Sequence, residues 1–295
     1  MFTFDRRFML LWGGLIIAIL LEHVLLTNVY KKDSSLKRFL SKPTNTEKTD
    51  LVYFIFYYFL WKGVIKNVTL LFTLPGIAYL AIKEANKLID FDGIFGGLVI
   101  SNYSLSVIVW LVLIDINSYL HHWLMHKVPA LWHFHKVHHS AVNMNIITGI
   151  RLSIAERAFY YLITIGISTL LLGLPNPKVI FTVLFIRQFI DLLQHSDLPW
   201  DYGWLGYIIA SPRFHRLHHS SDPKDFDKNY GNIFSLMDYI FGTVSKRYIK
   251  NSAIADIVPL GLSTQKETSK YNIWWVSLYK DTLLESIINL ISKRY

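Results

Sequence analysis

Residues 97–120, GLVISNYSLSVIVWLVLIDINSYL, run directly into residues 121–140, HHWLMHKVPALWHFHKVHHS. The first segment is long enough to cross a bilayer, which takes about 20 predominantly apolar residues. The second segment holds seven of the twelve histidines of the chain. The sequence therefore predicts a membrane helix that ends in a cluster of imidazoles.

Three other stretches have the same apolar character. Residues 8–30 and 51–82 are each long enough to span, and residues 158–193 form two apolar runs separated by GLPNP at 173–177. Glycine and proline at that point break the helix and predict a hairpin that spans or re-enters the membrane. We expect an all-α integral membrane protein with about four transmembrane or re-entrant helices and a histidine-rich cytosolic helical cap.

The distribution of lysine and arginine predicts the topology. Residues 31–50 contain six of these side chains, whereas residues 83–96 contain two. By the positive-inside rule, 31–50 lies in the cytoplasm, and both histidine segments return to that side. We expect a multi-pass protein of the bacterial inner membrane or the endoplasmic reticulum, with its histidine site facing the cytoplasm.

Three regions follow from this organisation. Residues 1–114 carry the N-terminal transmembrane helices, residues 115–245 the histidine core with the hairpin 158–193, and residues 246–295 a C-terminal cytosolic tail. The chain has no cysteine, which excludes disulfides and thiolate chemistry. Its net charge of +9 is not arranged as a basic run with exposed aromatics, so we expect a membrane surface rather than nucleic acid as the partner.

Histidine spacing carries the functional signal. His122 and His126 stand at i, i+4, and two HxxHH motifs end at His139 and His219, so on helices each set shares a face. A further histidine closes the return helix of the hairpin. The expected metal ligands are His122, His126, His135, His138, His139, His195, His215, His218 and His219.

Imidazole is a good ligand for iron, copper and zinc. Nine ligands exceed the four to six that one ion takes, so the number indicates two metal ions. A loose metal-buffering tract is the alternative, but such tracts lack helical offsets. His121 and His133 point away from the ligand faces and are expected to be bystanders or supporting groups, and His23 to be an ordinary satisfied polar side chain.

These motifs resemble those of the fatty acid hydroxylase and sterol desaturase superfamily of membrane di-iron oxygenases. The resemblance rests on YLHHWLMHKVPALWHFHKVHHS (119–140, with the tyrosine at 119) and on SPRFHRLHHSSDPKDFDKNYG (211–231). Asn145, Arg151 and Glu156 also stand at family-typical positions. Trp123 and Ser153 replace an arginine and a histidine that are usual in the family.

The resemblance implies two iron ions that use O2 to hydroxylate or desaturate a C–H bond of a lipid or sterol-like substrate. Zinc can replace iron in purified protein because affinity alone favours it. Asp115, Tyr119 and Asp191 precede ligand histidines at helical spacings and are candidate supporting groups, in which a carboxylate accepts the second N–H of an imidazole.

Electrons must come from outside the chain, because it has no dinucleotide-binding glycine pattern and no haem motif. A separate reductase or electron carrier is therefore expected as a partner. A pterin-dependent enzyme similar to the alkylglycerol (ether lipid) monooxygenases is an alternative. A metal-binding or metal-transport protein is the alternative outside enzymes, although a transporter would place its ligands near the middle of the membrane.

Overall fold

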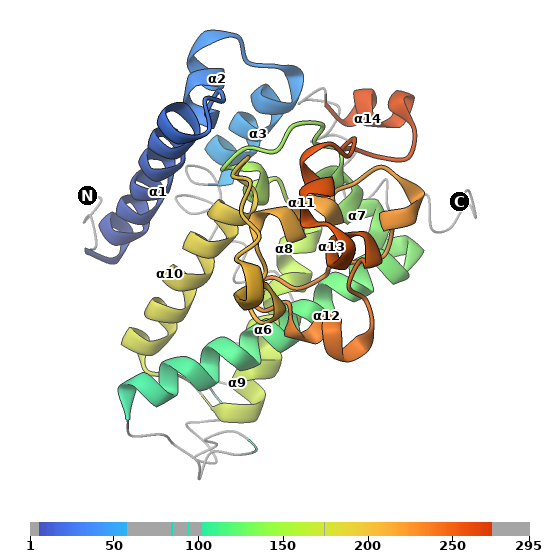
Figure 1. Ribbon diagram of the computed structural model, residues 1–295. Helices are drawn as coiled ribbons and strands as arrows, with labels where there is room; N and C mark the ends of the chain where they lie inside the picture. Colours follow the sequence, from blue (N-terminus) through green and yellow to red (C-terminus); the bar gives the residue numbers. More distant parts are fainter. Residues whose placement is uncertain (1–5, 58–83, 85–93, 95–101, 174, 273–295) are drawn as a thin grey trace.

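The computed structural model describes residues 6–57, 84, 94, 102–173 and 175–272 (Figure 1). This part of the chain is helical, and its only β-structure is two isolated bridges. The helices are α1 (Arg6–Val24), α2 (Ser35–Ser41), α3 (Asn45–Ile55), α6 (Tyr103–Lys127), α7 (Pro129–His139), α8 (Ile154–Tyr160), α9 (Ile167–Leu172), α10 (Pro177–Gln194), α11 (Pro212–His218), α12 (Leu236–Phe241), α13 (Lys246–Lys250) and α14 (Gln265–Tyr271). Short 3-10 or π-helical turns join several of them.

Two helical stretches in the described part are long and apolar enough to cross a membrane, namely Tyr103–Lys127 and Ala155–Leu172. The second stretch combines part of α8, a π-helical segment and α9. Residues 13–29 are apolar but shorter. The expected span at 51–82 lies mostly outside the described residues, as does the end of the expected tail at 246–295, so the expected number of about four spans stays a prediction.

The junction between α6 and α7 folds the chain back on itself. The Asn102 side chain accepts the backbone N–H of Leu105 and starts α6. Val128 adopts an extended conformation before Pro129, which begins α7. Helix α7 then packs against α6, so the two histidine-bearing helices face each other.

The hairpin brings the next ligand to the same place. The chain breaks at Gly173, whose φ of 77° lies in the left-handed region, and α10 starts at Pro177 under the Asn176 cap. Helix α10 returns along α6 and also contacts α1 (Figure 1). Its C-cap residue is His195.

The segment after α10 forms the helical cap. Its core contains Phe214 and Leu217 from α11, packed against Tyr248 and Val258. Ser211 caps α11 by accepting the Phe214 backbone N–H, and Pro212 stands at its first turn. Helix α11 contacts α10, so its histidines lie beside the end of the hairpin.

The lysine-rich segment 31–50 packs on the loop that follows α7. Arg38 donates to the backbone carbonyl of Met144 over 2.7 Å and pairs with the buried carboxylate of Glu47 at 2.8 Å. The buried Arg151 pairs with Asp50 of α3 at 3.1 Å and donates to Ser140 over 2.6 Å. These contacts hold the end of α7 and place segment 31–50 at the histidine end of the molecule.

Candidate metal centre

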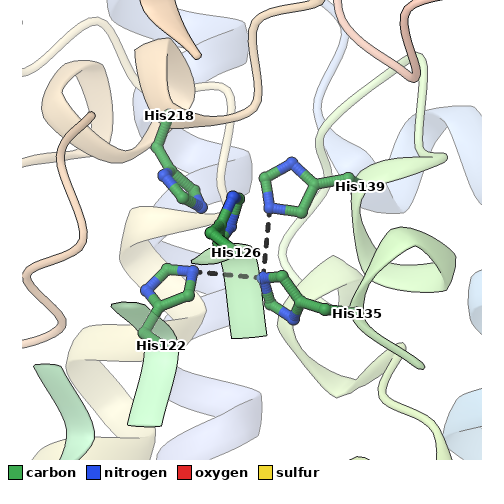
Figure 2. A group of neighbouring side chains, drawn as sticks. All are labelled: His122, His126, His135, His139 and His218. Atoms are coloured by element: carbon green, nitrogen blue, oxygen red, sulfur yellow. Dashed lines mark hydrogen bonds between the residues drawn. The ribbon is translucent and has the colours of Figure 1, made fainter. Parts of the chain in front are cut away.

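All nine histidines expected to be ligands gather into two groups. In each group, one ring nitrogen of every member lies within 4.8 Å of those of the others. The five-histidine group, drawn in Figure 2, consists of His122, His126, His135, His139 and His218. The four-histidine group consists of His138, His195, His215 and His219.

Each of the two HxxHH helices contributes histidines to both groups. Helix α7 gives its i, i+4 pair, His135 and His139, to the five-histidine group and His138 to the other. Helix α11 supplies His215, at i, i+4 from the C-cap residue His219, to the four-histidine group and sends His218 to the first. His138 and His139 belong to different groups because neighbouring residues on a helix point in directions that differ by about 100°.

The Nε2 atoms of the five-histidine group face each other. The Nε2 atom of His135 lies 3.1 Å from that of His122 and 3.2 Å from that of His139 (Figure 2). The Nδ1 atom of His122 is 2.8 Å from the Tyr230 carbonyl oxygen. A carbonyl only accepts, so Nδ1 carries the proton and Nε2 is left with a bare lone pair.

His135 is fixed in the same tautomer by a carboxylate. Its Nδ1 donates to Glu156 over 2.6 Å, and both side chains are buried. The bare Nε2 lone pairs of His122 and His135 therefore point at each other, which is unfavourable without a cation between them. Nitrogens that share one metal ion at about 2.1 Å lie about 3 Å apart, so the spacing fits a bound metal.

The four-histidine group repeats this geometry with fewer fixed partners. The Nε2 atom of His195 lies 2.9 Å from that of His215 and 3.3 Å from that of His138, while its Nδ1 donates to the Asp191 backbone carbonyl over 2.8 Å. His219 Nε2 is 3.2 Å from His215 Nε2. Convergent nitrogens again point to one ion.

Several ring nitrogens are buried without a hydrogen-bond partner in the described part of the chain. In the five-histidine group these include the Nε2 atoms of His126 and His218. A buried polar atom without a partner is costly, and a metal ion would satisfy both nitrogens. The residues present therefore fit two metal ions.

Burial keeps the imidazoles neutral. Desolvation, followed by the neighbouring imidazoles, lowers the pKa of His139 and of His219 well below the usual range. The same cause lowers the pKa of His135 and His215. Neutral imidazole is the form that binds a metal, so the site is ready for ligation at neutral pH.

One of the expected supporting carboxylates has a different partner from the imidazole that its spacing predicts. The spacing of Asp115 predicts that it accepts an imidazole N–H, but its two oxygens accept the backbone N–H groups of Ile233 and Phe234, at 2.7 and 3.1 Å. Asp115 therefore anchors the cap to α6. The carboxylate that orients a ligand imidazole is Glu156, which the sequence marks only by its family-typical position.

The other two candidates differ from each other in what they contact. Asp191 has a carboxylate oxygen 3.6 Å from Nδ1 of His195, one helical turn away. Tyr119 forms a 2.9 Å hydrogen bond with Thr243, and its ring stacks on that of Phe241. Asp191 is thus placed to influence an imidazole, whereas Tyr119 joins α6 to the cap.

The remaining histidines lie outside both groups. His121 is buried beside the rings of Phe159 and Tyr160, and His133 belongs to neither ligand set. His23 lies 2.7 Å from the hydroxyl of Ser34, near the start of the lysine-rich segment 31–50.

Comparison with known proteins identifies the segment that carries this site. The family model for fatty acid hydroxylase matches residues 107–243. An ornithine lipid hydroxylase of Rhizobium tropici is 34% identical over 138 residues, which cover 46% of this chain and 41% of that protein. An alkylglycerol monooxygenase of Danio rerio is 33% identical over 130 residues, covering 44% and 28%.

A cholesterol 25-hydroxylase of Mus musculus is 28% identical over 161 residues, covering half of each chain. The chain thus spans half or less of the length of these relatives. No solved structure matches the chain. The matched segment contains both histidine groups, and its match together with these relatives supports a place for the chain in the fatty acid hydroxylase and sterol desaturase superfamily.

Proposed function

We propose that this protein is a membrane-bound oxygenase that holds two iron ions and hydroxylates a C–H bond of a lipid. The observation that supports the proposal is the convergence of nine imidazoles into groups of five and four, with bare Nε2 lone pairs facing each other. When bound there, iron would supply the activation of O2 and the removal of hydrogen from an unactivated carbon, which no side chain can do.

The chain's own residues prepare that chemistry. The Tyr230 and Lys228 carbonyls and the Glu156 carboxylate hold the Nδ1 protons of His122, His218 and His135, and this leaves each Nε2 free to ligate. Hydrogen bonding to a carboxylate also makes the imidazole a stronger donor to a metal. Burial excludes water that would compete for the open positions.

Electron balance supports a redox partner. Insertion of one oxygen atom of O2 into a C–H bond, with the other released as water, consumes two electrons and two protons. The chain has no cysteine and no pattern typical of a flavin or nicotinamide site. We propose that a separate reductase or electron carrier supplies the electrons at the cytoplasmic face.

The segment with six lysines and arginines supports that orientation. It contacts the loop after α7 through Arg38 and through the Ser35 hydroxyl, which accepts the Ile146 backbone N–H over 3.1 Å. The positive-inside rule assigns such a segment to the cytoplasm. The histidine groups at the same end would then open to the cytoplasmic side of the membrane.

The substrate class follows from the setting and the relatives. The histidine-bearing end of α6 continues from an apolar helix, so a substrate would arrive from the bilayer and gain about 0.8 kcal/mol per buried CH2. Hydroxylation is favoured over desaturation because the relatives above are named hydroxylases or monooxygenases. An ether lipid with pterin as donor is the second candidate, on the match to alkylglycerol monooxygenases.

Untargeted lipidomics under 18O2 tests the proposal. Cells that express the protein should contain a lipid two mass units heavier under 18O2 than the same hydroxylated product made under 16O2. A His138→Ala, His218→Ala variant should make none. A product lighter by two hydrogens and without label would instead indicate desaturation, and no oxygen-dependent product with an active reductase present would favour metal binding or transport.

A further inference from the structure

The cap carries an exposed apolar edge made of two segments, residues 203–208 and 233–241, called here the cap edge. Trp204 is 73% exposed, Phe241 64% and Ile240 61%. Tyr207 and Ile208 are also exposed, and the Tyr207 ring lies against that of Tyr239 at 5.2 Å. So much apolar and aromatic surface in one place marks an interaction surface.

The cap edge lies alongside the apolar part of α6. Asp115, the middle residue of that helix, accepts the backbone N–H groups of Ile233 and Phe234, and Tyr119 stacks on Phe241. Figure 1 shows α12 beside α6. Asp115 is twelve residues before the end of α6 at Lys127, or about 18 Å along the helix axis. The cap edge therefore reaches well below the polar end of α6.

At this level α6 itself presents exposed apolar side chains. Ile108 is 57% exposed, and Val112, Ile116 and Leu120 follow at four-residue intervals, each more than a third exposed. Residues four apart share one helix face, so this row is the face that a spanning α6 turns to lipid. The cap edge is continuous with that helix.

Hydrogen bonds within the protein join the two segments of the cap edge. The N–H of Ala210 donates to the Ile233 carbonyl over 2.9 Å, and that of Ser235 donates to the Ile208 carbonyl over 3.0 Å. The Ser235 hydroxyl donates to the Gly206 carbonyl over 2.7 Å. Irregular backbone is tolerated at membrane depth only where its polar groups are satisfied by the protein.

We propose that the cap edge is inserted into the lipid leaflet on the histidine side, with its side chains in the boundary between headgroups and acyl chains. Tryptophan and tyrosine are enriched at that boundary, which accommodates an apolar ring with a polar tip. The cap is then a membrane-embedded element rather than a body held in the cytosol. This inference rests on α6 as a span and not on the metals or the reaction.

The absence of cysteine allows a direct test, because each introduced cysteine is the only one in the chain. Trp204→Cys and Ile240→Cys variants carry a nitroxide label in lipid nanodiscs, and spin relaxation measures collisions with O2, which dissolves in lipid, and with a neutral nickel chelate, which stays in water. Both positions are exposed, so neither variant empties a core.

Ile108→Cys on α6 is the lipid reference. Lys224→Cys is the water reference, since it is exposed and stands three residues before Asp227, which pairs with Lys127 at the polar end of α6. The proposal expects an O2-to-nickel accessibility ratio at both cap-edge positions close to that of Ile108→Cys and several-fold above that of Lys224→Cys. Ratios equal to that of Lys224→Cys would overturn it.

Low accessibility to both reagents at the cap edge would also overturn the proposal and would indicate a protein cover, such as a second copy. Nickel access at Ile108→Cys would refute α6 as a span and the inference with it. Neither result depends on enzyme activity, so failure here is distinguishable from failure of the proposed oxygenase.

Discussion

The two histidine groups are similar in their Nε2 spacing and different in how they are held. In the five-histidine group, His122, His135 and His218 each donate through Nδ1 to a fixed acceptor of the chain. In the four-histidine group only His195 does, and the Nδ1 atoms of His138, His215 and His219 have no hydrogen-bond partner among the described residues. We infer that the first group is preorganised and the second more dependent on its ion.

The largest expected effect is the loss of one metal ion when a single ligand is removed. Which ion is lost should depend on the spatial group of the histidine and not on its sequence motif. His218→Ala should lose the same ion as His122→Ala, although His218 lies on α11. His138→Ala should lose the same ion as His195→Ala. Metal analysis and the iron spectrum of purified variants measure this, with His133→Ala as the control that keeps both ions. If the variants of one HxxHH motif all lost the same ion, the assignment of each motif to both groups would be refuted.

A smaller effect is expected when the carboxylates beside the ligand histidines are neutralised, and it should differ between Glu156 and Asp191. Glu156→Gln removes the charge that holds the Nδ1 proton of His135, and loss of such a partner costs about 10–100-fold in metal affinity or activity. Asp191→Asn should cost less, because the backbone carbonyl of Asp191 still accepts from His195 at 2.8 Å. Competition with a chelator gives both affinities. Equal losses of metal affinity in the two variants would contradict the inference that the two groups are held differently.

Gly149 tests the four-histidine group alone. A Cβ at this position would lie 2.8 Å from His195 Nδ1 and would also meet the Asp191 carboxylate. Gly149→Ala should therefore displace His195 and weaken the ion of that group by about tenfold, as for other supporting contacts. The ion of the five-histidine group should be unaffected. Gly166→Ala, where a Cβ has room, is the matched control.

The smallest effect is a gradual dependence of metal-free stability on pH. Burial lowers the pKa of His139 and His219 in the folded state, whereas an unfolded imidazole titrates near about 6.5. Below that pH the unfolded state takes up more protons than the folded state, so the free energy of unfolding falls as pH falls from 7 to 5. Chemical denaturation of metal-free protein in detergent measures it. A rise on acidification would contradict burial of neutral imidazoles.

Helical spacing predicted the members of the centre but not their division. The i, i+3, i+4 pattern identifies His135, His138 and His139 as one face, and the structure brings all three to the centre. Which group each joins depends on where α7 and α11 lie relative to each other, and that placement comes from tertiary packing between segments about 75 residues apart. A periodic pattern within one helix has no information about it.

The supporting groups show the same limit. Asp115 has the right spacing for an imidazole partner, yet its carboxylate accepts hydrogen bonds from the backbone N–H groups of residues 233 and 234. Glu156 reaches His135 because Ser153 caps α8 and fixes the direction of its first turn. In the sequence, Ser153 stands out only as a departure from the family pattern. Contacts of this kind come from tertiary structure and leave no local periodicity.

The exchange of histidines between α7 and α11 has a consequence for how such a centre can be inherited. A fragment ending at Gly173 would carry five of the nine histidines but lack His218, and the complementary fragment would lack His138. Neither half contains one finished site. Neither group as it stands can therefore be gained, lost or transplanted as a module, because each draws ligands from both halves of the chain.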